Sequence, residues 1–205
     1  MSSANPESMF LEMTRKTIQV LFSSFCPLLL LSMLWMFIGD GDQSNLEHAK
    51  AAAKRGDAVA EYFLGRAYFQ GKDVAQDYSK AAELFRKAAE QGNAQAQNDL
   101  GVMFENGLGV ERDLTEAVNW FTRSAEQGDP NGQCNLGRMY ATGSGMDIDL
   151  VKAYQWLSLS EAQGESAART LLAATEPAMT HRELAEGQRL VAEYQSGVRR
   201  IAEVK

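Results

Sequence analysis

The 205-residue sequence has few of the residues on which disulfides, metal sites and most catalytic centres depend. Its two cysteines, Cys26 and Cys134, fall in different parts of the chain, which excludes a disulfide framework, and their spacing is not that of zinc ligands. Its two histidines, His48 and His181, have no nucleophile or carboxylate at a useful spacing. We therefore expect no metal, no cofactor and no enzymatic activity.

The sequence also lacks a run of basic residues. The net charge is −7, and from residue 45 onward 23 acidic residues stand against 18 basic ones. A nucleic-acid-binding surface needs a stripe or patch of Lys and Arg to neutralise phosphates. Nucleic acid is therefore not an expected partner.

Residues 17–39 contain no charged side chain. About 20 apolar residues in a helix cross the hydrocarbon core of a membrane, so the segment is long enough. Basic residues directly precede it and acidic residues follow it, which places residues 1–16 in the cytoplasm and the remainder across the membrane. We predict an uncleaved, single-pass signal anchor, followed by a short linker at 40–44. In a bacterium this means the inner membrane, with the following domain in the periplasm.

Two alternatives for this segment stay open. A cleaved signal peptide would need small residues before the cleavage site, but the −3 and −1 positions before Asp40 are Phe37 and Gly39. A buried core helix is the other alternative, although 23 uncharged residues are long for one.

From residue 58 the sequence repeats with a period of 36. The segments 58–93, 94–129 and 130–165 align without a gap. The matching columns, one residue from each repeat, are Leu64, Leu100 and Leu136; Gly65, Gly101 and Gly137; Tyr68, Phe104 and Tyr140; Gly71, Gly107 and Gly143; Asp77, Asp113 and Asp149; Ala81, Ala117 and Ala153; and Gly92, Gly128 and Gly164. In the first repeat we predict a helix A at about 58–70, a glycine-containing loop, and a helix B at about 78–91.

Several columns have a clear physical role. The aspartates are predicted to cap the start of helix B, and the last glycines to end it in the left-handed conformation. A glycine inside helix A costs about 1 kcal/mol relative to alanine. Its recurrence predicts a close helix–helix approach, with the bulky column Leu84, Trp120 and Trp156 as the expected neighbours.

The patterns LG-x-x-Y-x-x-G, G-V-x-x-D-x-x-x-A-x-x-W-F and A-E-Q-G resemble the Sel1-like repeat, a relative of the tetratricopeptide repeat. Repeat one departs from it with Asp73 at the second loop glycine, and repeat three with Met146 at the valine, which puts the exact loop turn in doubt. The resemblance implies an all-α fold, a right-handed α-solenoid of three helix-pair repeats with capping helices. Some Sel1-type proteins are linked to β-lactam hydrolysis, but they resemble cysteine-paired repeats, and this sequence lacks the pairs. A β-lactamase-like hydrolase is therefore a remote alternative.

Both ends of the array should carry caps that cover the last apolar face. Residues 45–57 read as a lone helix B. Residues 166–205 begin as a fourth helix A, which should stop at Glu176-Pro177. A capping box from Thr180 to Glu183 then starts a final amphipathic helix. We interpret that helix as a C-terminal cap, with a docking helix as the alternative.

Stacked helix pairs form a concave surface, which helix A lines in this superfamily. On one arc of helix A the residues differ between repeats, as recognition residues would. The candidate partner-binding residues are Tyr62, Phe63, Arg66, Phe69, Asn98, Asp99, Val102, Glu105, Asn135 and Arg138. The three aromatic ones are the most informative, because exposed aromatic side chains often anchor contacts. Their alternative role is packing against the 45–56 helix.

The expected function is that of a membrane-anchored adaptor or scaffold for a protein or peptide partner, with an obligate structural subunit of a membrane complex as the alternative. In the same column as Tyr62 and Asn98, Cys134 is expected to be a small, half-buried helix residue. An intermolecular disulfide through it would be the functional alternative.

Overall fold

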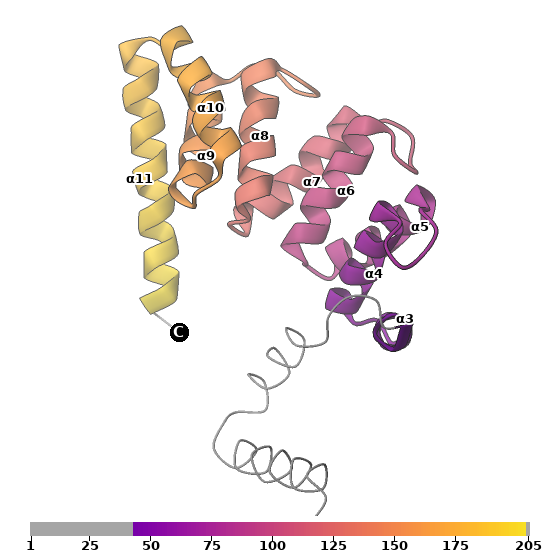
Figure 1. Ribbon diagram of the computed structural model, residues 1–205. Helices are drawn as coiled ribbons and strands as arrows, with labels where there is room; N and C mark the ends of the chain where they lie inside the picture. The colour runs from indigo at the N-terminus through magenta and orange to yellow at the C-terminus, as the bar shows by residue number, and fades with distance from the viewer. Residues whose placement is uncertain (1–42, 204–205) are drawn as a thin grey trace, which may run out of the picture. The chain divides into compact units, whose positions relative to one another are not determined.

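The computed structural model describes the backbone of residues 43–203 and the side chains of residues 46–197. In this part of the chain the secondary structure consists of nine α-helices and one short 3-10 turn (Figure 1). They are α3 (Gln43–Lys54), α4 (Ala58–Gln70), α5 (Tyr78–Glu90), α6 (Ala94–Asn106), α7 (Leu114–Glu126), α8 (Pro130–Thr142), α9 (Leu150–Ala162), α10 (Ser166–Thr175), η1 (Glu176–Ala178) and α11 (His181–Glu203).

The predicted anchor at 17–39 and the tail at 1–16 lie outside the described residues. Among the helices between residues 43 and 203, none combines the length and the apolar character that a membrane crossing requires.

Helix B begins at the predicted aspartate in all three repeats. The carboxylate of Asp77 accepts from the backbone N–H of Lys80 at 3.0 Å, and that of Asp149 from Lys152 at 3.0 Å. Asp113 accepts from two backbone N–H groups, at 2.9 and 3.0 Å. The predicted caps are therefore confirmed, and each satisfies backbone donors that the first helical turn leaves unpaired.

Two glycine columns at helix ends adopt the left-handed conformation, and of these the column that ends helix B was predicted to do so. At the end of helix A the φ angles are 70°, 68° and 70° for Gly71, Gly107 and Gly143. At the end of helix B they are 89°, 88° and 94° for Gly92, Gly128 and Gly164. Side chains disfavour this region, which explains why glycine recurs there.

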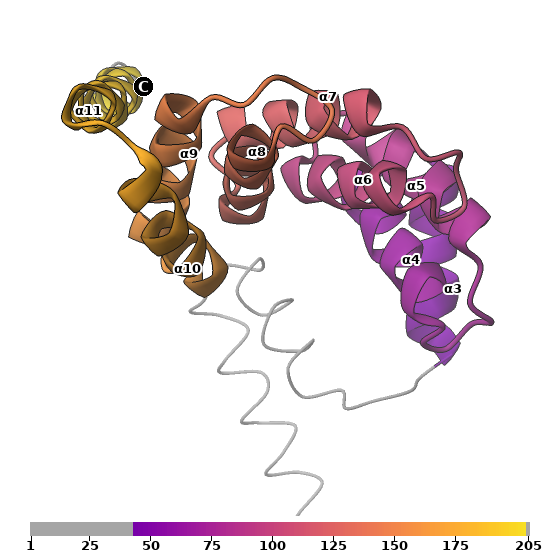
Figure 2. The ribbon, with the colours of Figure 1, turned by 90° about the horizontal axis from the view of Figure 1, so that it is seen from above.

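The helices pack in sequence order. Helix A and helix B contact each other within each repeat, and each helix B contacts the helix A that follows it. In Figure 2 the array curves, with α6, α8 and α10 toward the inner side and α7 and α9 toward the outer side. One core cluster runs from α4 to α8, in which Phe85, Leu100 and Phe121 are almost completely buried, and a second includes Leu157 and Leu172.

The helix A glycines do mark close approaches, but the neighbours differ from those predicted. A Cβ on Gly65 or Gly101 would lie 2.7 Å from the ring of Phe85 or Phe121, and one on Gly137 would lie 2.7 Å from Cγ of Leu157. These neighbours occupy the column after the predicted one. Leu84 does contribute, since its Cβ would lie 3.3 Å from a Cβ on Gly65. The crossing of the two helices, which periodicity alone does not specify, selects the neighbouring column.

The second loop glycine is needed where a repeat follows another repeat. A Cβ on Gly109 would lie 2.3 Å from the carbonyl carbon of Tyr78, and one on Gly145 would lie 2.6 Å from the carbonyl oxygen of Leu114. Both contacted residues begin helix B of the preceding repeat. Asp73 holds the same backbone conformation in repeat one, with φ 63°, and its side chain is exposed. Aspartate at the place of this loop glycine therefore keeps the left-handed conformation.

A ladder of polar side chains also links the repeats. The amide of Gln127 donates to Oε1 of Gln97 at 2.6 Å, and one repeat later Gln163 donates to Gln133 at 2.8 Å. In turn Gln97 and Gln133 donate to carbonyls of the preceding helix B. In repeat one the acceptor is Glu61, which Gln91 reaches at 2.7 Å. The ladder satisfies polar groups that are buried between the stacked units.

Further helices flank the three repeats on both sides in the sequence. Before the repeats, helix α3 ends in the same way as helix B does. Gly56 follows it with φ 82°, and the N–H of Asp57 donates to the carbonyl of Ala52. Its role as the N-terminal cap stays a prediction.

At the other end α10 stops where Pro177 was predicted to stop it, and the Thr180–Glu183 capping box forms. The final helix α11 packs on α9, with the rings of Trp156 and Tyr194 5.6 Å apart. This packing supports the interpretation of α11 as a cap.

Candidate partner-binding site

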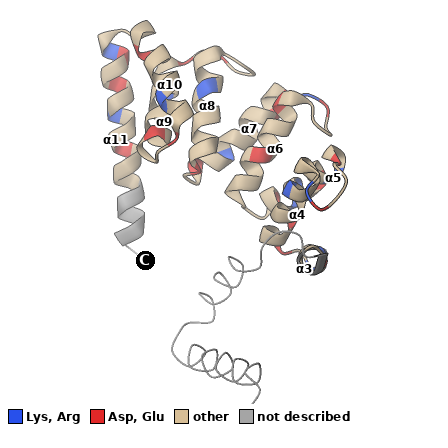
Figure 3. Cartoon of the chain, in the orientation of Figure 1, with Lys and Arg blue, Asp and Glu red and all other residues tan. Residues whose placement is uncertain are grey.

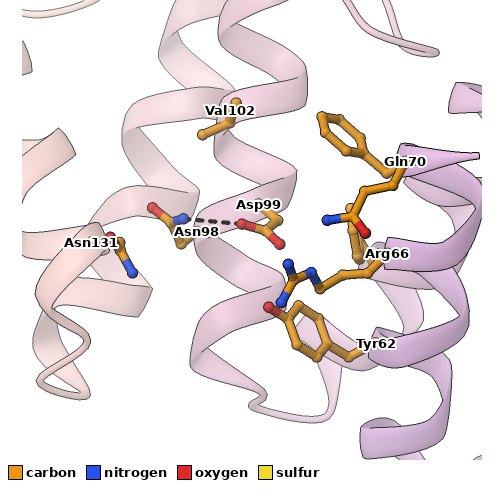
Figure 4. Close-up of a pocket in the computed structure, with 9 residues that line it drawn as sticks. Tyr62, Arg66, Gln70, Asn98, Asp99, Val102 and Asn131 are labelled. Atoms are coloured by element: carbon orange, nitrogen blue, oxygen red, sulfur yellow. Dashed lines mark hydrogen bonds between the residues drawn. The ribbon is translucent and has the colours of Figure 1, made fainter. Parts of the chain in front are cut away.

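A pocket of about 350 Å³ opens between the helix A elements of the first two repeats (Figure 4). Its walls come from α4 and α6, with one residue from α5 and one from the first turn of α8. The lining residues are Tyr62, Arg66, Phe69, Gln70, Phe85, Asn98, Asp99, Val102 and Asn131. A pocket of this size is large enough for one amino-acid side chain of a partner.

Aromatic rings and one aliphatic side chain form the apolar part of the pocket. The Tyr62 ring lies 5.8 Å from that of Phe85, and Phe69 meets Tyr78 edge-on at 5.4 Å. Two roles were left open for Tyr62, an exposed anchor or a packed residue, and at 8% exposure it is a packed residue whose neighbour is Phe85 of α5. Both rings pack on α5, and this packing holds them in defined orientations.

The polar part of the pocket centres on Asp99. Its carboxylate accepts from the side-chain amide of Asn98 at 3.2 Å, and the Arg66 guanidinium and the Tyr62 hydroxyl point toward it across the gap (Figure 4). Burial raises the pKa of Asp99, although Asn98, Arg66 and Tyr62 act in the opposite direction. Burial also raises the pKa of Tyr62, and the neighbouring Asp99 adds to this effect.

A second polar group continues this surface from α6 to α8. Arg138 donates to the Glu105 carboxylate at 2.7 Å, and Asn135 donates to Oδ1 of Asn98 at 2.9 Å. The charged pair joins helix A of repeat two to helix A of repeat three. It therefore holds these two helices in register on the inner side of the array.

The structure thus brings nine of the ten predicted residues into two adjoining clusters. Six line the pocket, and Glu105, Asn135 and Arg138 form the polar group beside it. The tenth, Phe63, does not line the pocket and is 47% exposed. Three lining residues were missed. Of these, Gln70 lies on the predicted arc, whereas Phe85 belongs to helix B and Asn131 lies two repeats along the chain.

Other candidate residues lie away from the pocket. Cys134 is buried beside Leu157, Ala168 and Leu172, more deeply than expected, and burial raises the pKa of its thiol. Between residues 43 and 203, no group of three or more His, Cys, Asp and Glu side chains is arranged to hold a metal ion. Figure 3 shows Lys and Arg dispersed among Asp and Glu on the coloured helices, with no continuous basic stripe on the face in view.

Comparison with protein families finds the repeat as well. The family model described as the Sel1 repeat matches residues 58–93, 94–129 and 130–165. These are the three segments that the 36-residue period delimits. Comparison with curated proteins gives no match.

Comparison with solved structures finds similar proteins in bacteria. A Sel1 repeat protein from Oxalobacter formigenes is 37% identical, with a TM-score of 0.58, and the match covers 63% of this chain and 98% of that protein. A protective antigen with an SLR fold, present in uropathogenic Escherichia coli, is 25% identical, with a TM-score of 0.57, over 78% of this chain and 43% of that antigen. The cysteine rich protein B of Helicobacter pylori is 21% identical, with a TM-score of 0.52, over 65% of this chain and all of that protein, a similarity that concerns the fold alone.

Proposed function

Because the chain belongs to the Sel1-repeat family, whose members generally mediate protein–protein interaction, we propose that it is a membrane-anchored adaptor that binds a protein or peptide partner. The partner binds on the face that the helix A elements of this chain form. The observation that carries this proposal is the pocket between α4 and α6, where variable residues of successive repeats converge. In a solenoid the fold determines the repeated columns, so the variable columns are free to determine recognition.

The composition of the pocket supports recognition of a peptide. Aromatic rings supply a large contact area at a low entropic cost, and hot spots of interfaces are enriched in Tyr and Arg. Side-chain amides of Asn98, Gln70 and Asn131 surround the apolar wall. Such amides pair with the backbone N–H and C=O groups of an extended segment.

Photo-crosslinking in the native membrane tests the proposed face. The photoreactive residue p-benzoylphenylalanine replaces Gln70, which is exposed and lines the pocket. The matched control replaces Glu90, which is exposed and ends α5 as Gln70 ends α4. A discrete adduct from position 70 alone supports the adaptor and identifies the partner by mass spectrometry.

Other outcomes of this experiment contradict the proposal. Adducts of equal yield from both positions would indicate a subunit that is permanently embedded in an assembly. Absence of adducts at both positions would remove the support for a binding face on helix A.

The membrane anchor is tested separately. We expect the full chain to stay in the membrane pellet after alkaline extraction, with its N-terminus intact by mass spectrometry, and a variant lacking 17–39 to lose this association. A shortened chain without these residues would indicate a cleaved signal peptide instead. Release of the intact chain into the supernatant would contradict anchoring.

A further inference from the structure

The Asp99 carboxylate occupies an unusual place for a charged group. It lies in a pocket whose walls include three aromatic rings and Val102, and it is only partly exposed. Burial raises its pKa even though one cation and two hydrogen-bond donors surround it. The positive charge now in the pocket therefore does not fully offset the loss of hydration. A cation that pairs with this carboxylate more closely than Arg66 does would therefore be favourable.

The cation that now faces Asp99 belongs to an exposed side chain. The Arg66 side chain is exposed, and its guanidinium lies 5.9 Å from the centre of the Tyr62 ring. Arg138, in the same column two repeats later, shows the contrasting arrangement. Its side chain is 28% exposed and is locked to Glu105 at 2.7 Å. Exposed side chains reorient at little cost, so Arg66 leaves the pocket more readily than Arg138 leaves Glu105.

We propose that this pocket receives the guanidinium of an arginine in an extended peptide, with Asp99 as its counter-charge and Tyr62 and Phe69 as its aromatic walls. Arg66 marks the binding position, because its own guanidinium lies over Tyr62 and faces Asp99 (Figure 4). The incoming arginine displaces it. This inference rests on the proposed function, because it identifies the chemistry of the partner at the same face.

The surrounding chemistry favours arginine over lysine and over acidic side chains. A planar guanidinium stacks on an aromatic face and pairs with a carboxylate at the same time, whereas an ammonium group is more strongly hydrated and does not stack. The part of the chain from residue 45 onward carries 23 acidic and 18 basic residues, so its field attracts a basic peptide.

The test uses small probes of the side chain alone. Nα-acetyl-arginine N-methylamide and its lysine, glutamine and glutamate counterparts are titrated into the full ¹⁵N-labelled chain in non-ionic detergent. The signals followed are the side-chain amides of Asn98, Gln70 and Asn131. We expect saturable shifts with the arginine probe, weaker ones with lysine, and none with glutamine or glutamate. No saturable shift with the arginine probe would overturn the proposal.

Two substitutions then have opposite expected effects. Asp99→Asn keeps the shape of the side chain and should weaken arginine binding about tenfold or more, which corresponds to about 1.4 kcal/mol. Arg66→Ala removes the competing cation and should tighten binding several-fold. The control Glu111→Gln removes an exposed carboxylate outside the pocket and should leave the affinity within about twofold.

If Asp99→Asn binds arginine like the wild type, or if Arg66→Ala abolishes binding, the pocket does not recognise a cation through Asp99. A glutamate probe that binds the wild type and is lost in Arg66→Ala would show recognition of an acidic peptide. In that case the proposed function stands and this inference fails. Absence of crosslinks from position 70 would instead remove the proposed function itself.

Discussion

Replacing Gly101 by alanine should destabilise the repeats, although alanine is the better helix former. The new Cβ would lie 2.7 Å from Cε1 and 2.8 Å from Cδ1 of Phe121, whose side chain is fully buried. Carbon atoms in contact prefer about 3.5–4.0 Å, so α6 or the ring must move by about 1 Å. A buried ring in a close-packed core has no free space to move into.

The size of the effect follows from two opposing terms. Alanine gains about 1 kcal/mol over glycine inside a helix. Overpacking of a well-filled core costs about 1–3 kcal/mol and occasionally more. With a contact this short we place the cost at the upper end of that range, about 3 kcal/mol. We therefore expect a net loss of about 2 kcal/mol in the free energy of unfolding.

Gly197→Ala is the matched control. Gly197 lies inside α11, and a Cβ there would meet no atom within 4 Å. The same substitution should therefore stabilise the protein by about 0.5–1 kcal/mol. Urea unfolding of a fragment containing residues 43–205, followed by circular dichroism at 222 nm, gives both midpoints. A Gly101→Ala variant as stable as the wild type would refute the close-approach reasoning.

Buried polar groups give three other predictions, all measured on the same fragment. Gln133→Leu should cost about 1–3 kcal/mol in urea unfolding, because the carbonyl of Ala125 and the amide of Gln163 lose their partner, and an unchanged midpoint would contradict the polar ladder. Burial raises the pKa of Asp99 in the folded state above its value of about 3.9 in the unfolded chain. The ionised carboxylate therefore disfavours folding, and the free energy of unfolding falls as pH rises from below the unfolded-state pKa through the folded-state pKa. Asp99→Asn should thus gain stability relative to the wild type between about pH 3 and pH 7, and a constant difference across that range would argue against this cause. Cys134 should react slowly with a disulfide reagent at pH 8 and faster as urea opens the array, because the thiol is buried and burial raises its pKa. Complete reaction within seconds in the absence of urea would show that the thiol is accessible.

The features that sequence analysis predicted well depend on local geometry. A carboxylate at Asp77 reaches a backbone N–H three residues ahead, whatever the rest of the fold does. The left-handed glycines and the stop at Pro177 are local in the same sense. The 36-residue period then aligns these signals in three copies, which is why the bounds of helix A and helix B were predicted almost to the residue.

What sequence analysis missed depends on how helices cross. Periodicity assigned the close contact of Gly65 mainly to Leu84, whereas the helix crossing brings Phe85 nearer. Likewise the variable positions of helix A left open whether Tyr62 is exposed or packed, and the packing of α4 on α5 buries it.

For the pocket, helix A variability predicted the lining residues on α4 and α6 except Gln70. It did not predict Asn131, because that residue reaches the pocket only through the stacking of a third repeat.

The loop at Asp73 makes the three repeats unequal as building blocks. A copy of repeat one inserted after another repeat would bring a side chain to the position of Gly109, where even a Cβ comes within 2.3 Å of the preceding helix. Repeats two and three carry glycine there, so this position does not clash with a preceding helix B. Lengthening of this array by gene duplication is therefore restricted to units from the second repeat onward, and the unit that carries Asp73 is suited only to the first place.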